Sequence, residues 1–298
     1  MKSASLACDA LRHSALILPA QHRKEVENRM PVTVEKGPQL YEGKAKILYG
    51  TDDPGVAVME FKDSLTAFDA VKTGSEAGKG AINNAISALL MGRLNDLGVP
   101  TCFIRQLDAT HSLVWRVEIV PLEVIVRFEM QGSFCKRYGT TSGIPIYPPL
   151  LEIGYKCDAL HDPFLNDDAV VAMGLATRDE LHSIRYLTIC TSHDLCHIFR
   201  HAGITLLDLK FEFGRITRQG DQHPTIILAD EITPDTCRLV DAKTGEKLDK
   251  DLFRFDIGDL GAGYRKLAKK LGLDSHLPGT PAEEVSLTGP EQPERRGC

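Results

Sequence analysis

Several features that would assign this chain to a specialised class of protein are missing from its sequence. None of its 298 residues belongs to an apolar run of the roughly 18 residues that a membrane-spanning helix needs. The eight cysteines are scattered and include no Cys-x-x-Cys pair, which excludes a zinc ribbon and a disulfide framework. We therefore expect reduced thiols, as is typical of a cytoplasmic protein.

An excess of positive charge is also missing. The formal net charge is −6, whereas a general affinity for nucleic acid or for an anionic membrane requires clustered basic residues. The composition, with 43% hydrophobic and 26% charged residues, is that of a globular protein. We expect neither nucleic acid nor membrane as a partner, so any anionic ligand must be bound by local positive charge.

The length of the chain predicts two lobes that share a cleft. Residues 1–37 are predicted to form a loosely ordered extension, because Asp9 and Arg12 interrupt the apolar stretch that a secretory signal would need. Residues 275–298 are rich in Pro, Gly and Glu and are predicted to be disordered. Between these tails we expect a β-rich, nucleotide-binding lobe at 38–117 and an α+β lobe with the substrate and metal site at 118–274.

Residue patterns predict the elements of both lobes. A helix is expected at 81–98, ended by Gly98, and a longer helix from Thr177 to Gly203, in which Thr177 and Glu180 form a capping box. A last helix is expected at 261–273. Short β-branched or aromatic segments predict strands at 40–50, 56–69, 101–107, 112–120, 122–128, 206–213 and 225–232. The fold class is therefore α+β.

The stretch LLDLKFEFG, residues 206–214, alternates leucine and phenylalanine with charged residues. In a strand, Asp208, Lys210 and Glu212 point to one face and the apolar side chains to the other. The ordinary interpretation is an antiparallel strand whose charged face lies in water. The alternative is that this face lines a cleft in which a metal, a phosphate and a carboxylate are balanced.

The next predicted strand, in TIILADEITPDTCRL, ends in Asp230 and Glu231. If the two strands pair, Glu212 and Asp230 can lie side by side, where two carboxylates repel unless a cation separates them. Mg²⁺ takes one or two protein carboxylates together with substrate phosphates. A surface cluster of ion pairs explains the same residues, and the pattern alone leaves both interpretations open.

Two glycine and lysine turns are candidate phosphate sites. Gly43, Lys44 and Lys46 lie between predicted strands, where a nucleotide could bind under a hairpin, although an exposed hairpin has the same pattern. Lys79, in the segment GKGAINN, leads into a helix whose N-terminal amides could bind an anion, or that segment could be a simple helix cap.

Two further clusters carry chemistry-bearing residues. Arg127 ends a predicted strand and is followed by Ser133 and Arg137, a grouping that suits a phosphorylated or carboxylated substrate. His193, His197 and His201 recur every four residues on one helix face, as in an HExxH zinc site, but Asp194 stands where that motif has glutamate and no third-ligand pattern follows. Buried or capping histidines are the alternative.

Five motifs carry a resemblance to a known family: LYEGKAKILY, GKGAINN, EVIVRFEMQGSFCKRYG, DLKFEFG and LADEITPDTCRL. In this order and spacing, over about residues 40–273, they resemble the phosphoribosylaminoimidazole-succinocarboxamide synthase (SAICAR synthetase) family. The resemblance implies a kinase-like N-terminal antiparallel β lobe over an ATP-grasp-like C-terminal α/β lobe. It also implies an ATP-dependent ligase of de novo purine biosynthesis, which is often a homo-oligomer. The ligase would join L-aspartate to carboxyaminoimidazole ribotide (CAIR) to give SAICAR, ADP and phosphate.

The resemblance also implies roles for single residues. It assigns Glu212 and Asp230 to Mg²⁺ and places Lys210, Asp69 and Asp208 near the reacting groups. Contacts to ATP are implied for Gly43, Lys44, Lys46 and Lys79, and contacts to the substrates for Arg127, Ser133, Arg137, Asp162 and Arg238. A protein-kinase-like phosphotransferase is disfavoured because HRD and DFG triplets are absent. A non-catalytic nucleotide-binding protein would lack the two metal-binding acids, which this chain has.

Overall fold

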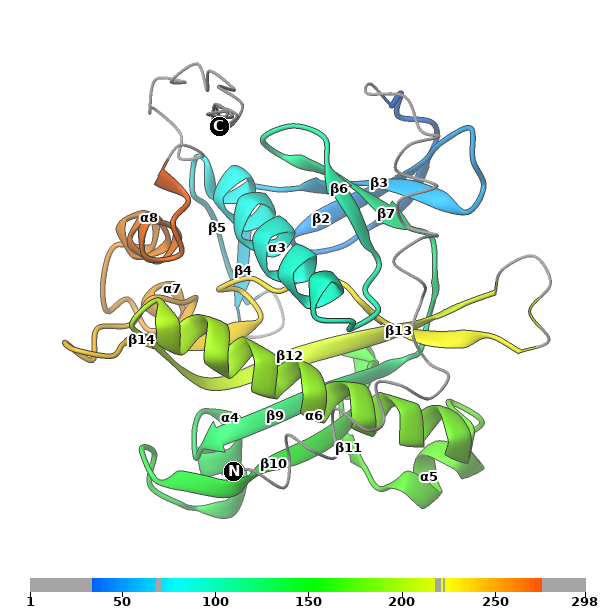
Figure 1. Ribbon diagram of the computed structural model, residues 1–298. Coiled ribbons are helices and arrows are strands. Elements are labelled where there is room, and N and C mark those ends of the chain that lie inside the picture. The colour runs from blue at the N-terminus through cyan, green and yellow to red at the C-terminus, as the bar shows by residue number, and fades with distance from the viewer. Residues whose placement is uncertain (1–33, 68–70, 218–220, 222, 275–298) are drawn as a thin grey trace, which may run out of the picture.

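The computed structural model describes residues 34–67, 71–217, 221 and 223–274 (Figure 1). The predictions for the C-terminal tail, for most of the N-terminal extension and for Asp69 lie outside the described residues. Among the described helices, none combines the length and the apolar character needed to cross a membrane.

The first sheet has five strands, and each pairs antiparallel with its neighbour. Its central strand, β3, is buried along almost its whole length because both of its edges are paired. A separate hairpin, β4 (Ser64–Ala67) with β5 (Lys72–Ser75), follows this strand. The order across the sheet is β1 (Gln39–Glu42), β2 (Lys46–Gly50), β3 (Val56–Phe61), β7 (His111–Trp115) and β6 (Phe103–Gln106).

The second sheet has seven strands and is also antiparallel. Its longest strand, β12 (Ile204–Ile216), pairs with β9 on one side and β13 on the other, and also with β8 (Glu118–Ile119) and β14 (Cys237–Asp241). The main order is β11 (Phe164–Leu165), β10 (Pro145–Tyr155), β9 (Leu122–Glu129), β12 and β13 (Thr225–Ala229). The predicted α+β class, with antiparallel sheets, is confirmed.

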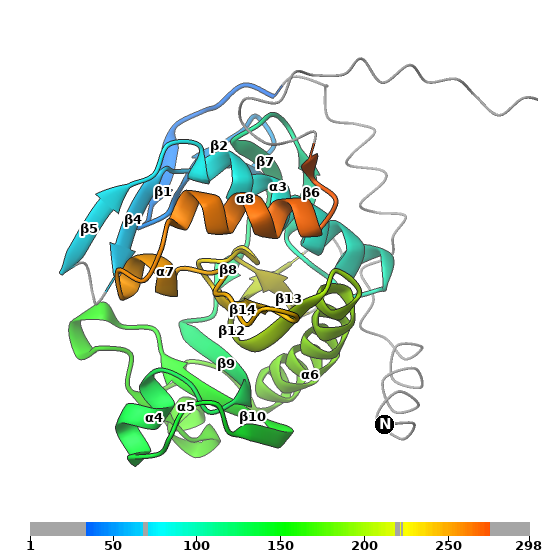
Figure 2. The same cartoon turned by 90° about the vertical axis from the view of Figure 1, so that its left-hand side faces the viewer.

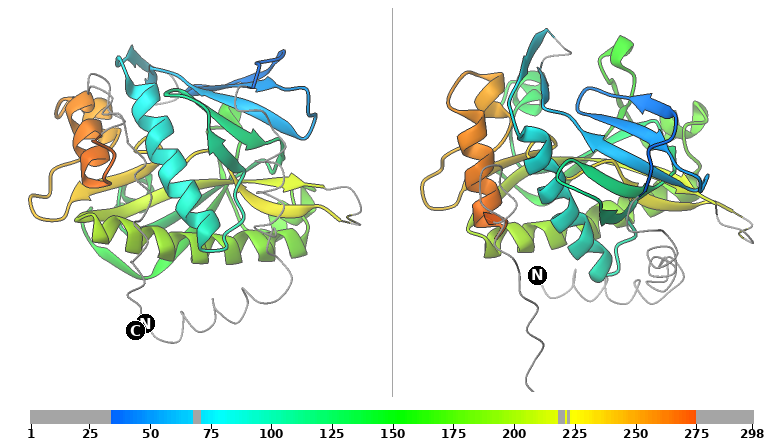
Figure 3. Two further views of the ribbon diagram at one scale, coloured as in Figure 1. Left: turned by 45° about the horizontal axis from the view of Figure 1, so that its top comes forward. Right: turned by 90° about the horizontal axis from the view of Figure 1, so that it is seen from above.

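Two long helices pack on these sheets. Helix α3 (Lys79–Asp96) contacts β3, β6 and β7, and ends before Gly98, whose φ of 85° suits glycine. Helix α8 (Leu260–Lys270), capped by Asp259, packs beside α3 (Figures 2 and 3). Helix α6 (Arg178–His201) lies along β12 and begins with the predicted capping box of Thr177 and Glu180. The shorter helices are α4 (Ser133–Tyr138), η1 (Asp158–Leu160), α5 (Asp167–Ala172) and α7 (Asp251–Arg254).

Backbone hydrogen bonds join the two sheets at one place. The amide of Cys102 donates to the carbonyl of Leu228 (2.7 Å), and the amide of Leu228 donates to the carbonyl of Pro100 (2.9 Å). The buried residues of both sheets belong to one continuous apolar core. This junction holds the strands of the first sheet close to the end of β13, where Asp230 follows. The boundary between the lobes at residues 117 and 118 stays a prediction.

Candidate active site

A large cleft lies between the two sheets. Its volume is about 1080 Å³, slightly above the range of roughly 300–1,000 Å³ that small-molecule sites occupy. The turn between β1 and β2, and the hairpin strand β4, form one wall, while β9, β12 and the segment after β13 form the other. The lining includes the predicted site residues Gly43, Lys44, Lys46, Arg127, Ser133, Asp208, Lys210, Glu212, Asp230 and Arg238.

Strand β12 supplies the charged centre of the cleft. Asp208, Lys210 and Glu212 all line it, as the alternation of the sequence predicted. Both faces of the strand are removed from bulk water: Glu212 is 3% exposed, and Phe211 and Phe213 are 2% and 1% exposed. The ordinary interpretation, a charged face in water, is therefore wrong, because β12 lies inside a sheet whose polar side forms the cleft wall.

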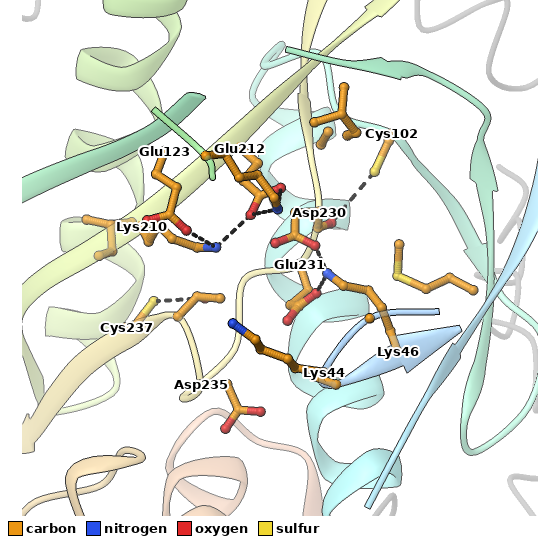
Figure 4. Close-up of a pocket in the computed structure, with 18 of the residues that line it drawn as sticks. Lys44, Lys46, Cys102, Glu123, Lys210, Glu212, Asp230, Glu231, Asp235 and Cys237 are labelled. Carbon is orange, nitrogen blue, oxygen red and sulfur yellow. Dashed lines mark hydrogen bonds and ion pairs between the residues drawn. The ribbon is translucent and has the colours of Figure 1, made fainter. Parts of the chain in front are cut away.

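Glu212 is held by two lysines (Figure 4). Its carboxylate accepts hydrogen bonds from Lys156 Nζ (2.6 Å to each oxygen) and Lys210 Nζ (2.6 Å), and Lys210 also contacts Glu123 (3.2 Å). Burial opposes ionisation of Glu212, but Lys210, Lys156 and Lys46 outweigh it and lower the pKa of Glu212 to about 2. Burial likewise opposes the charge of Lys210, whose pKa is nonetheless raised by Glu212 and Glu123. Both groups are therefore charged at neutral pH.

A second group of charges lies opposite, where β2 faces the end of β13. Lys46 forms ion pairs with Asp230 and Glu231 (Figure 4). Asp230 has a φ of 63°, so the chain turns sharply where the buried strand ends. Burial lowers the pKa of Lys46 to about 7 and raises the pKa of Asp230 to about 7. Burial thus opposes the charge of each group, and the ion pair between them offsets that cost.

Two arginines share one carboxylate at the far end of the cleft. Oδ2 of Asp208 accepts hydrogen bonds from Nη1 of Arg127 (2.9 Å) and from Nη1 of Arg238 (2.8 Å). Arg127 also donates to the hydroxyl of Ser133 (3.1 Å). The Arg238 guanidinium packs directly against Gly132. A Cβ at this position would lie only 2.6 Å from Nη2 of Arg238. The arrangement fixes two planar cations side by side, which suits a phosphate or carboxylate.

The turn between β1 and β2 brings backbone amides and lysines to the cleft. The amide of Gly43 donates to the carbonyl of Lys46 (2.9 Å) and closes the turn. Lys44 extends from it to the exposed carboxylate of Asp158 (3.0 Å). Lys44 is half exposed whereas Lys46 is almost covered, so the two lysines offer one accessible and one buried positive charge.

Comparison with known proteins shows to which family the chain belongs. The family model of SAICAR synthetase matches residues 39–271. The chain is 47% identical over 238 residues to phosphoribosylaminoimidazole-succinocarboxamide synthase of Persephonella marina, covering 80% of this chain and 98% of that protein. The corresponding protein of Acidiphilium cryptum is 46% identical over 235 residues, covering 79% and 92%. This chain belongs to the SAICAR synthetase family.

Comparison with solved structures supports the same family. The fold matches the crystal structure of phosphoribosylaminoimidazole-succinocarboxamide synthase from Ehrlichia chaffeensis with a TM-score of 0.77 and 39% identity, over 79% of this chain and 99% of that one. It matches a SAICAR synthetase (type 2) in complex with ADP with a TM-score of 0.74 and 39% identity, over 80% and 99%. The resemblance inferred from the five sequence motifs is confirmed.

The predicted magnesium ligands of this SAICAR synthetase family member were tested against the donor atoms present. Within the described residues, no group of three or more His, Cys, Asp or Glu side chains could hold a metal ion. The ionised carboxylate of Glu212 and the buried carboxylate of Asp230 both line the cleft. Two carboxylates, completed by substrate phosphates and water, fit the usual environment of Mg²⁺.

The predicted anion site at the start of α3 is already filled by the protein. The amides of Gly78 and Gly80 donate to the carboxylate of Asp63 (3.1 and 2.8 Å). The side chain of Lys79 has no exposed surface and pairs with Asp235 (2.9 Å). Because both the amides and the ammonium are used internally, we do not include Lys79 in the nucleotide site.

Two predicted substrate contacts lie outside the cleft lining. Arg137 pairs with Glu152, and its guanidinium carbon lies 3.8 Å from the centre of the Phe164 ring. Asp162 accepts a hydrogen bond from the amide of Cys157 (2.8 Å) and so shapes the turn after β10. In this structure the two residues support the cleft wall.

Three cleft residues that pair with the predicted ones were missed in the sequence analysis. Lys156 follows β10, a strand that was not predicted because Pro145, Pro148 and Pro149 disguise it. Glu123 alternates with Val124 and Val126 at the start of β9 and so could have been assigned to the polar face. Glu231 was noted beside Asp230 without a role.

Proposed function

We propose that this chain joins L-aspartate to the carboxylate of CAIR at the expense of ATP, and releases SAICAR, ADP and phosphate in purine biosynthesis. The observation that carries the proposal is the cluster of partly buried lysines and carboxylates around the buried Glu212 in one open cleft, formed by Lys46, Lys156, Lys210, Glu212 and Asp230. Membership of the SAICAR synthetase family, and the presence of ADP in one similar solved structure, support it.

The chemistry explains why such a cluster is needed. A carboxylate is a poor electrophile, so an oxygen of the CAIR carboxylate first attacks the γ-phosphorus of ATP, and ADP leaves. The amine of aspartate then attacks the acyl carbon of the resulting acyl phosphate, loses a proton, and expels phosphate. Neither step needs a protein nucleophile. The protein must instead bring together anions that repel one another and stabilise the charge that moves between them.

We assign each residue a role according to the wall of the cleft on which it lies. We assign Lys44, Lys46 and the turn at Gly43 to the phosphates of ATP, because they belong to one wall of the cleft. Lys210 and Lys156, on the opposite wall, neutralise the reacting carboxylate and the transferred phosphoryl group. Mg²⁺ bound by Glu212 and Asp230 would add positive charge between phosphate oxygens.

The two arginines and Ser133 are assigned to the ribotide. Arg238 and the Ser133 hydroxyl offer donors that match the oxygens of a phosphate. Arg127 is 1% exposed and bonded to Glu152 and Asp208, so it holds these groups in place. Asp208 holds both guanidinium groups in register and so acts on the substrate through them. This arrangement separates the ribotide phosphate from the ATP phosphates by the width of the cleft.

Three broader features complete the proposal. The five-stranded sheet with its β1 and β2 turn would act as a kinase-like lobe over ATP, and the seven-stranded sheet as an ATP-grasp-like lobe. The enzyme would work in the cytoplasm, as a homo-oligomer, on these small-molecule substrates. The scattered cysteines, of which the buried Cys102 and Cys237 form no disulfide with a described residue, support a reducing location.

The test is an assay of ADP release by the purified chain with MgATP, CAIR and L-aspartate, in which each component is omitted in turn. Release that requires all components, together with SAICAR detected by mass spectrometry, is the expected result. Release that continues without CAIR would indicate simple ATP hydrolysis. Absence of release under every condition would contradict the proposed function.

A further inference from the structure

The histidines of α6 form a pair that the proposed reaction does not use. Nε2 of His193 and Nε2 of His197 lie 3.2 Å apart, and the ring centroids are separated by 4.5 Å at an interplanar angle of 65°. The spacing of four residues places both rings on one face of the helix. No residue of α6, which is described along its whole length, lines the cleft. The pair is therefore a separate feature.

The distance between the two nitrogens matches a metal chelate. Imidazole nitrogens bind Zn²⁺ at about 2.0–2.1 Å, so two of them on one ion lie about 2.9 Å apart at a right angle and about 3.4 Å apart at a tetrahedral angle. The observed 3.2 Å falls between these limits. The two Nε2 atoms therefore already have the separation that binding to one metal ion requires.

A carboxylate lies beside one of the two rings. On the other side of the His193 ring, Nδ1 lies 3.7 Å from Oδ1 of Asp194. A carboxylate on that side favours a proton on Nδ1 and leaves Nε2 free to bind a metal, as outer carboxylates do in known sites.

The solvent exposure of the pair and its imidazole ligand atoms indicate which metal ions could bind. The side chain of His193 is 47% exposed, so an ion can reach the pair from solvent. Two imidazoles without a carboxylate ligand suit Ni²⁺, Cu²⁺ or Zn²⁺ and do not suit Mg²⁺.

We propose that His193 and His197 form a two-ligand surface site for a divalent transition metal, with water at the remaining positions. The site differs from the hydrolytic zinc site considered from the sequence, because no third ligand is grouped with the pair among the described residues. It is also independent of the ligase reaction, since it lies on α6 and excludes Mg²⁺ by ligand type.

The test is isothermal titration calorimetry with NiCl₂ on the full chain, without nucleotide and in the presence of excess MgCl₂. We expect one site per chain whose affinity falls at least about tenfold in His193→Gln and in His197→Gln, as the loss of a ligand should cost no less than the loss of an outer partner. His182→Gln, also exposed on α6, is the matched control and should bind like the parent.

Two results would overturn the proposal. One is Ni²⁺ binding that is unchanged in the double variant His193→Gln/His197→Gln, because the metal would then bind elsewhere. The other is the absence of saturable binding to the parent chain. Circular dichroism of each variant should match that of the parent, since the replaced side chains lie at the surface of the helix.

Discussion

Two aspartates five residues apart, Asp230 and Asp235, are both buried but occupy opposite electrostatic environments. Burial raises the pKa of Asp230 to about 7, whereas Lys250 and Lys79 outweigh burial and lower the pKa of Asp235 to about 2. Asp230 contacts Lys46, which it shares with Glu231. Asp235 accepts from Lys79 (2.9 Å), Asn83 (3.1 Å) and the hydroxyl of Tyr264 (2.6 Å).

We assign the two aspartates different roles: ligand binding for Asp230 and stabilisation of the fold for Asp235. The bonds of Asp235 come from α3 and α8, so this carboxylate ties both helices to the loop that follows β13. Asp235 lines the same cleft as Asp230 and Glu212, but its two oxygens already accept hydrogen bonds from side chains of two packed helices. We infer that a cleft carboxylate whose partners come from packed helices stabilises the fold, and that one paired with the lysines of the cleft is available to a ligand. Four substitutions test this distinction.

The largest effect is expected for Glu212→Gln. The substitution removes a charge that Lys156, Lys210 and the proposed Mg²⁺ share, so kcat should fall by about 10²–10³-fold, as for other electrostatic contacts to a transition state. The control is Glu118→Gln in β8, which pairs with the same strand but is 75% exposed. Its kcat should stay near that of the parent. A near-normal rate for Glu212→Gln with intact circular dichroism would contradict the metal assignment.

Asp235→Asn should destabilise the fold more than it alters chemistry. Loss of the carboxylate leaves the ammonium of Lys79 buried without its partner, which typically costs about 3–5 kcal/mol in the free energy of unfolding. Denaturant unfolding at pH 7 measures this difference. If the variant unfolds like the parent while kcat collapses, Asp235 belongs to the reaction centre and the distinction fails.

The same aspartate predicts an acid dependence. Its pKa is about 2 in the folded state against an ordinary value of 3.8, so its stabilising contribution is complete above pH 3.8 and is lost as the pH falls toward 2. The contribution is on the order of 2 kcal/mol. Unfolding free energies of the parent should therefore decline over this interval more steeply than those of Asp235→Asn. Parallel curves would contradict the assigned ion pair.

A smaller effect is expected for Gly132→Ala. The new Cβ would lie 2.6 Å from the guanidinium of Arg238, which must move, so the KM for CAIR should rise about tenfold, equivalent to about 1.4 kcal/mol. Gly139→Ala, at the other end of α4, is the control, because its φ is also positive (64° against 53°) and no atom lies within 4 Å of its Cβ. Its ψ is 30° whereas that of Gly132 is −122°, so backbone strain adds to the contact with Arg238 only at Gly132. Equal KM values for the two variants would contradict a role for Arg238 in binding CAIR.

The smallest effect is expected for Asp168→Asn. Asp168 pairs with Arg178 at 2.7 Å, but the side chains are 79% and 69% exposed, so water screens the pair. Unfolding free energy should change by less than about 0.5 kcal/mol. A loss as large as that of Asp235→Asn would show that burial does not control the contribution of ion pairs in this fold.

Local patterns predicted much of the fold. The capping box at Thr177 and Glu180, and the end of α3 at Gly98, were assigned from residues within a few positions of each other. Strand β10 was missed because its prolines obscure the period of two, although an antiparallel edge can accept them. The alternation in β12 gave its polar face, whereas its burial depended on pairing with β9 and β13, which no local pattern encodes.

As with the fold, local patterns in the sequence predicted part of the candidate site. Motifs identified most of the cleft residues, since polar residues alternating along a strand or following it are visible in the sequence. The amides at the start of α3 bind Asp63 in this structure, a contact between residues 15–17 positions apart that no local pattern reveals. Lys156 was missed because it follows the unpredicted strand β10, and its contact with Glu212 joins residues 56 positions apart.

The most direct test of the central claim uses CAIR whose carboxylate carries ¹⁸O. If the cleft activates this carboxylate as an acyl phosphate, one labelled oxygen must leave with phosphate when aspartate attacks, and ³¹P NMR or mass spectrometry of the phosphate detects it. We predict one ¹⁸O in each phosphate released, and the remaining label in SAICAR. Phosphate without the label, formed together with SAICAR, would contradict the account.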